Sequence, residues 1–169
     1  MRCTSRIARL AVLGAVIVTA GLVGTVEAGR RKGVRARING RPFKVGGRFT
    51  AGSTNGFGGI IITAGKPSIP GKSLKSFTIG CEVPGLSPTM AVPVTVPCGG
   101  GYAEVKVGLH AVNRAWATDD QIQLTVVSFD GTRLKATLAG QFETPGEQNP
   151  GDAPATVENG KVTVDLLGG

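Results

Sequence analysis

Alternation of apolar and polar residues is the feature that most limits the fold of this chain. It recurs in short runs after residue 28, as in "VRARI" at 34–38 and "KVTVDL" at 161–166. Side chains of an extended strand point in turn to its two faces, so a period of two predicts strands with one buried face. No stretch after residue 28 shows the three-and-four spacing of an amphipathic helix over eleven or more residues.

Turn signals separate these runs. Asn39-Gly40, Asp130-Gly131 and Asn159-Gly160 each stand between two alternating segments, and such pairs favour tight hairpin loops. Residues 34–45 are therefore predicted to form a hairpin. The alternation slips by one residue near Val126 and Val127, which predicts a β-bulge there.

The remaining runs complete the set of strands. They lie at 58–63, 77–81, 92–96, 102–110, 121–129 and 133–142. In 102–110, alternation places Ala103, Val105, Val107 and Leu109 on one apolar face. Pro93 predicts an edge strand at 92–96, because proline cannot donate to a ladder. Eight to ten short strands are typical of an antiparallel β-sandwich, with a barrel as the alternative. The segment 143–154 is predicted to be an exposed loop.

Two parts of the chain resemble a known class of domain. The opening "ARINGRPFK" and the close "DGTRLKATLAGQFE…VENGKVTVDL" are similar to uncharacterised exported bacterial domains with an immunoglobulin-like sandwich fold. The resemblance covers the first hairpin and the last 40 residues. It implies an exported sandwich and supplies no catalytic residue for this chain.

The first 28 residues have the pattern of a secretory signal peptide. Arg2, Arg6 and Arg9 precede an apolar run at 10–24, and "VEA" precedes Gly29 as a cleavage site. The run is shorter than the roughly 20 residues that span a bilayer. We therefore expect a secreted or periplasmic protein with a flexible basic arm at 29–33 and one domain at 34–169. The alternative is an uncleaved N-terminal anchor, since the basic residues after the run resist translocation.

Cys81 and Cys98 are the two cysteines after the predicted signal peptide. An even number in an exported chain predicts one disulfide, and a pair of free thiols is the alternative. The four prolines between them exclude a helix in that segment.

Positive charge is concentrated at the start of the domain. Residues 49–169 hold eight basic and ten acidic residues, whereas 30–48 hold eight basic residues and no acidic one. These candidate polyanion-binding residues are Arg30, Arg31, Lys32, Arg35, Arg37, Arg41, Lys44 and Arg48. Such a stripe can hold acidic glycans, lipopolysaccharide or anionic lipid. The alternative is a solvated edge strand whose charges prevent aggregation.

Several kinds of site are disfavoured. "AGKPSIPGKS" at 64–73 ends in Gly-Lys-Ser, but its spacing and its two prolines do not suit a phosphate-binding loop. His110 is the single histidine and has no nucleophile motif nearby. Trp116 is expected to fill the core, with an exposed ligand platform as the alternative.

The sequence also contains no motif for binding a metal, a cofactor or nucleic acid. Asp119, Asp120 and Asp130 lack a calcium-loop signature, and two thiols with one histidine have no zinc spacing. We expect no catalytic residue, no metal, no cofactor and no sequence-specific nucleic-acid binding. The expected function is a secreted, non-enzymatic binding or structural module. Polyanion binding through 30–48 is the alternative, and a hydrolase is a remote one.

Overall fold

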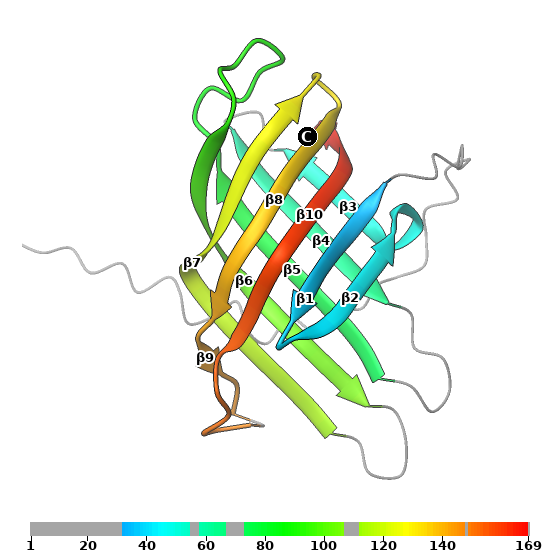
Figure 1. Ribbon diagram of the computed structural model, residues 1–169, viewed down its shortest axis with the longest axis vertical. Coiled ribbons are helices and arrows are strands. Elements are labelled where there is room, and N and C mark those ends of the chain that lie inside the picture. Colours follow the sequence, from blue (N-terminus) through cyan, green and yellow to red (C-terminus); the bar gives the residue numbers. More distant parts are fainter. Residues whose placement is uncertain (1–31, 55–57, 67–72, 107–111, 148, 169) are drawn as a thin grey trace, which may run out of the picture.

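Ten strands account for most of the residues that the structure describes (Figure 1). The structure is a computed structural model that describes residues 32–54, 58–66, 73–106, 112–147 and 149–168. The strands are β1 (Gly33–Ile38), β2 (Arg41–Gly46), β3 (Thr50–Thr54), β4 (Gly59–Lys66), β5 (Ser73–Glu82), β6 (Val94–Lys106), β7 (Val112–Phe129), β8 (Arg133–Phe142), β9 (Thr144–Pro145) and β10 (Ala155–Gly168). A short 3-10 turn, η1 (Gly47–Phe49), joins β2 to β3.

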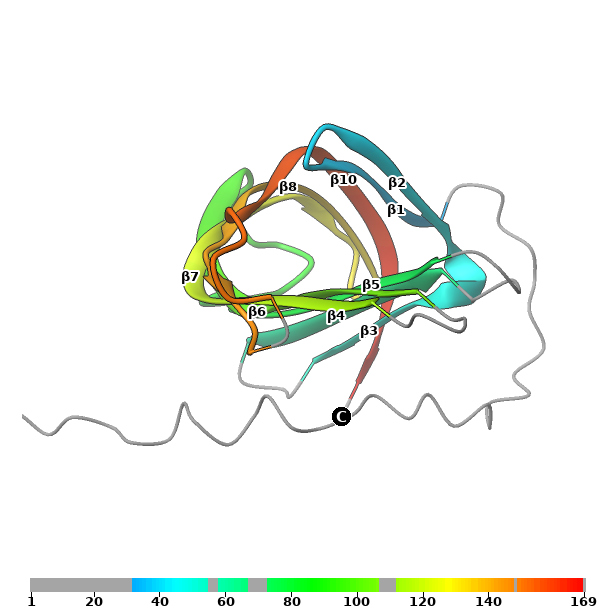
Figure 2. The ribbon, with the colours of Figure 1, turned by 90° about the horizontal axis from the view of Figure 1, so that it is seen from below.

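Seven of these strands close into a barrel in the order β10-β3-β4-β5-β6-β7-β8, and β8 pairs again with β10. Neighbours are antiparallel except β3 and β10, which are parallel over three residues. The β1–β2 hairpin extends the sheet from β10. Figure 2 shows the strands around a common interior. We call β7 from residue 121 onward, β8, β10, β1 and β2 the front wall, which faces the viewer in Figure 1, and β3–β6 the rear wall.

The all-β prediction is confirmed, but the sheet closes as the barrel alternative instead of forming a clear two-sheet sandwich. A sandwich needs two sheets with separate edges. Here β10 pairs with β8 along nine positions and with β3 at its last three residues, so it joins the two walls. β6 and β7 are also long, at 13 and 18 residues, and bend. β6 joins two runs that were predicted as separate strands, and β7 includes residues 112–120, for which no strand was predicted.

Glycine permits the close approach of neighbouring strands at two positions. Gly100 in β6 has φ +150°, and a Cβ there would lie 2.1 Å from the carbonyl oxygen of Thr78. Gly140 in β8 has φ +129°, and a Cβ there would lie 2.0 Å from the carbonyl oxygen of Gln121. A side chain at either position would push neighbouring strands apart.

Alternation fills the interior as predicted for most strands. The largest fully buried side chains are Tyr102, Phe43, Phe142, Ile60, Ile62, Ile79, Ile122, Leu124 and Leu134. The β1–β2 hairpin joins this core, since the Phe43 and Phe77 rings lie 5.4 Å apart. In the second half of β6 the predicted face is wrong. Tyr102 is buried there, while Ala103 and Val105 lie on the other side and are half-buried.

Two turn predictions are confirmed and one is wrong. Asn39 and Gly40 turn β1 into β2 with positive φ angles, and residues 130–132 join β7 to β8. The bulge near Val126 is present. Asn159 also has a positive φ, but β10 continues through it as a bulge. Both flanks of Asn159 keep β1 and β8 as partners, so the chain has no reason to reverse.

Proline and the loop at 143–154 also differ from expectation. Pro93 precedes β6, which lies between β5 and β7 and is no edge strand. The segment 143–154 contains β9, which pairs with β7, and the side chain of Asn149 in it is buried. The Asn149 Oδ1 accepts a hydrogen bond from the Ala115 backbone N–H at 3.0 Å. This segment therefore covers one end of the barrel.

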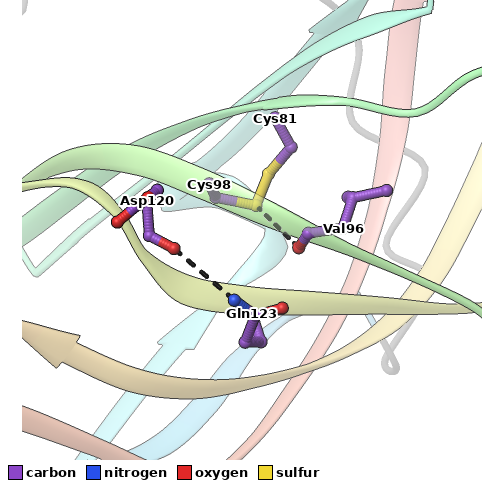
Figure 3. The surroundings of a disulfide bond; sticks show 5 residues. All are labelled: Cys81, Val96, Cys98, Asp120 and Gln123. Atoms are coloured by element: carbon purple, nitrogen blue, oxygen red, sulfur yellow. Dashed lines mark hydrogen bonds between the residues drawn. A yellow bond between two sulfur atoms is a disulfide. The ribbon is translucent and has the colours of Figure 1, made fainter.

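The predicted disulfide joins Cys81 and Cys98 (Figure 3). The two residues face each other on β5 and β6, and both are buried. The bond thus lies inside the barrel and links neighbouring strands. The loop between them is anchored by Val83, which is fully buried, and by Leu86 and Met90, which pack on the core.

The predicted signal peptide and most of the basic arm lie outside the described residues. Gly33 already belongs to β1. His110 and most of the Gly-Lys-Ser loop, residues 67–72, are also outside, and Ser73 begins β5. Across the described segments, no helix is long and apolar enough to cross a bilayer.

Candidate functional site

The eight predicted basic residues do not form one stripe. Arg30 and Arg31 lie outside the described residues. Lys32 forms an ion pair with Asp165 of β10. Arg48 is exposed in η1, at the corner between the walls. Arg41 starts β2 and belongs to a different group, described below. Arg35, Arg37 and Lys44 remain, and all three are exposed on the outer face of the front wall.

Strand pairing places a cation of β10 beside Arg35 and Lys44. Lys44 of β2 is the register partner of Arg35 of β1, and Arg35 is in turn the partner of Lys161 of β10. All three side chains are exposed. We call Lys44, Arg35 and Lys161 the basic row. Neighbouring strands lie about 4.8 Å apart, so the row is roughly 10 Å long.

No member of the basic row forms an ion pair with any of the described residues; the salt bridges there involve other side chains. Like charges on directly opposed strand positions destabilise a sheet. The row therefore holds two unfavourable pairs, Lys44–Arg35 and Arg35–Lys161. An anion bound across the three cations would relieve this repulsion.

Hydroxyl groups continue the same row across the wall. Lys161 is paired with Thr137 of β8, Thr137 with Thr125 of β7, and Thr125 with Thr95 of β6. We call Thr137, Thr125 and Thr95 the hydroxyl row. The Thr95 and Thr125 hydroxyl oxygens lie 2.8 Å apart and share a hydrogen bond.

Sequence reasoning missed Lys161 and the hydroxyl row. The outward direction of the Lys161 side chain can be inferred from the sequence, because Lys161 stands in an alternating run whose other face holds the buried Val162 and Val164. The position of Lys161 beside Arg35 cannot be inferred from the sequence, since it depends on pairing between strands more than a hundred residues apart. Arg37 is less isolated than Arg35, because its partner on β10 is the acidic Glu158.

Arg41 belongs to a different group, at the end of the barrel. Its charge acts on Glu104 and Tyr102, which lie on the inward face of β6. The Lys75 ammonium and the Tyr102 hydroxyl both donate to Glu104 Oε1 at 2.5 Å. Burial raises the pKa of Glu104, but the hydrogen bonds from Lys75 and Tyr102 outweigh it and leave that pKa below its usual value of 4.5. Burial, followed by the bond to Glu104, raises the pKa of Tyr102 far above its usual value.

Aromatic rings fill the barrel behind this group. The Tyr102 ring stacks 5.6 Å from Trp116 and 6.0 Å from Phe142. Trp116 is 4% exposed, and its indole N–H donates to the Ala153 carbonyl at 3.0 Å. The prediction that Trp116 fills the core is confirmed. No buried side-chain nitrogen or oxygen of the described residues lacks a hydrogen-bond partner, so the arrangement of this group suits a structural role at the barrel end.

The aspartates are not brought together. Asp119 and Asp120 are exposed on β7, and Asp130 lies ten residues further along, in the loop after the same strand. Ten residues of strand span about 33 Å. The described residues contain no group of three or more His, Cys, Asp and Glu side chains that could hold a metal ion.

The rear wall contrasts with the front wall. A row across its middle, through Ala51, Thr63, Thr78 and Gly101, carries no charge. Elsewhere on this wall Lys66 of β4 and Lys75 of β5 are register partners, but Lys75 forms an ion pair with Glu104 of β6. The Thr63 and Thr78 hydroxyl oxygens lie 3.2 Å apart, as a counterpart to the Thr95–Thr125 pair. Among the described strands, a row of three cations without an acidic partner therefore occurs only on the front wall.

Comparison of the chain with protein-family models, with curated proteins and with solved structures gave no match.

Proposed function

We propose that this chain is an exported, non-enzymatic binding module that holds polyanions on the basic row. The observation that carries the proposal is the alignment of Lys44, Arg35 and Lys161 on three adjacent strands, with no acidic partner among the described residues. Aligned like charges cost stability, so their presence is accounted for by an anion that bridges them.

Export is supported by the disulfide and by the N-terminal pattern. Cys81 and Cys98 are bonded within the barrel, and structural disulfides persist mainly in oxidising compartments. The apolar run at 10–24 and the small residues before Gly29 support a cleaved signal peptide. The polyanions present outside the cytoplasm include acidic glycans and anionic lipids, which agrees with the proposed ligand class.

Chromatography on a heparin resin tests the proposal. The oxidised protein should be retained at physiological salt, and Arg35→Gln with Lys161→Gln should elute at clearly lower salt. A charge-matched control is Arg48→Gln with Lys66→Gln, since neither residue belongs to the row. If the protein is not retained, or if both double variants shift elution equally, the basic row is not a polyanion site. The chain would then be better described as a structural module.

A further inference from the structure

We infer that the polyanion is an acidic polysaccharide, bound along the basic row and onto the hydroxyl row. This inference rests on the proposed function and names its ligand class. The three cations would hold carboxylate or sulfate groups, while Thr137 and Thr125 exchange hydrogen bonds with neighbouring sugar hydroxyls.

The two rows form one continuous track. Lys44, Arg35, Lys161, Thr137 and Thr125 are successive register partners on the five strands of the front wall. Four strand spacings of about 4.8 Å give a track of roughly 19 Å. The track lies between irregularities in pairing, since the β10 bulge begins after Lys161 toward Val157 and the β7 bulge lies at 126–128. Its residues therefore keep regular spacing.

The hydroxyls suit a sugar as a ligand. Thr137 is exposed, and its hydroxyl forms no hydrogen bond within the described segments. Thr125 is oriented by its bond to Thr95 and keeps further hydrogen-bonding capacity, because a hydroxyl has one donor and two acceptor sites. An acidic polysaccharide offers both charged groups and hydroxyls along one chain, which matches cations followed by hydroxyls.

Other polyanions match the track less well. Single-stranded nucleic acids are held by aromatic side chains on which bases stack, and no aromatic residue stands in either row. A lipid surface is bound most firmly where apolar side chains beside the cations enter the interface. Next to the cations, the track has threonines instead. Polyphosphate would use the cations alone.

The test distinguishes the contribution of the hydroxyl row to binding from that of the basic row. Binding is measured for the oxidised protein with three probes: heparin oligosaccharides, inorganic polyphosphate and phosphatidylglycerol vesicles. Thr137→Val with Thr125→Val removes both hydroxyls while keeping branched side chains that favour strands. The matched control is Thr63→Val with Thr78→Val on the rear wall. Unchanged Trp116 fluorescence verifies the fold of each variant.

We expect the front-wall threonine variant to bind heparin oligosaccharides about tenfold more weakly, as two lost hydrogen bonds imply. Its binding to polyphosphate should be unchanged, and the rear-wall control should match the wild type with all probes. An unchanged affinity for the oligosaccharides, or an equal loss with polyphosphate, would overturn the polysaccharide assignment. So would tighter binding of the vesicles than of the oligosaccharides. If polyphosphate and oligosaccharides both bind and both depend on Arg35, the polyanion function stands even where the sugar assignment fails.

Discussion

Arg35 is the residue in which binding and stability are expected to conflict. It stands between Lys44 and Lys161 on the neighbouring strands, and its side chain is exposed. Each directly opposed like-charge pair costs roughly 0.2–1 kcal/mol. A residue that weakens the sheet on both sides is expected to be kept for an interaction with something outside it.

Replacing Arg35 should therefore stabilise the protein. Arg35→Gln removes both like-charge pairs, and the free energy of unfolding should rise by roughly 0.5 kcal/mol. Urea unfolding followed by the fluorescence of Trp116 measures this change. Arg48→Gln is the control, since it removes the same charge from a position outside the row. A lower stability for Arg35→Gln would mean that Arg35 makes favourable contacts within the fold.

The direction of single side chains was largely readable from the sequence, but their neighbours were not. Alternation correctly places Arg35 and Arg37 on the outer face of β1. It gives no sign that Lys161 lies beside them, since register between distant strands is set by the closed sheet. Arg41 shows the reverse case. It belongs to the basic segment in sequence, yet its charge acts on Glu104 and Tyr102 at the barrel end.

Among the elements, β5 and β6 carry an internal polar group with a testable pH response. Glu104 has a lowered pKa in the folded protein, because the bonds from Lys75 and Tyr102 outweigh the effect of burial. A lowered folded pKa means that this group stabilises the fold above the unfolded value of about 4.5. That contribution is lost as the pH falls through the folded pKa.

Tyr102→Phe should raise the pKa of Glu104. The variant removes one of the two hydrogen-bond donors and leaves the carboxyl group partly buried, which favours its neutral form. Titration of the Glu104 carboxyl by NMR measures the change. Asp165 is an internal control, because its pKa is lowered by Lys32 and Arg133, which the variant does not touch. An unchanged titration of Glu104 would show that Lys75 alone sets its pKa.

The disulfide acts on the same pair of strands. Cys81 and Cys98 enclose 16 intervening residues, and the chain-entropy relation gives about 3 kcal/mol for a loop of this size. Cys81→Ala with Cys98→Ala should lower the free energy of unfolding by about that amount. Urea unfolding measures it, and the reduced wild-type protein should show a similar loss. A loss below about 1 kcal/mol in both would mean that β5 and β6 hold the loop without the bond.

At this scale the sequence predicted where strands exist better than where they end. The hairpin at 34–45 and the bulge near Val126 follow from local residue chemistry and are present. Asn159-Gly160 carries the same local signal as Asn39-Gly40, but pairing of β10 with β1 and β8 on both sides turns it into a bulge. The local sequence cannot show whether a turn or continued strand pairing is favoured at Asn159, because the outcome depends on which strands are neighbours.

For the molecule as a whole, closure of the sheet distributes charge unequally between the two walls. The basic segment was recognisable from composition, since 30–48 holds eight basic residues and no acidic one. Only the barrel brings β10 next to β1 and separates the front wall, with its basic row, from the uncharged row of the rear wall. We therefore expect the protein to bind a polyanion with its front wall facing the ligand.

The salt dependence of binding should report the number of cations engaged. A polyanion that contacts Lys44, Arg35 and Lys161 displaces counterions, so a plot of log affinity against log salt should have a slope of about −3. Arg35→Gln should reduce that slope by about 1, whereas Arg48→Gln should leave it near the wild-type value. Heparin oligosaccharide binding measured between about 50 and 200 mM salt covers the informative range. A much steeper slope, or an equal change for both variants, would indicate a diffuse attraction to the whole basic chain. A slope of about −3 that depends on Arg35 would instead locate the contact on the basic row, because only there do three unpaired cations occupy adjacent strands of the described sheet.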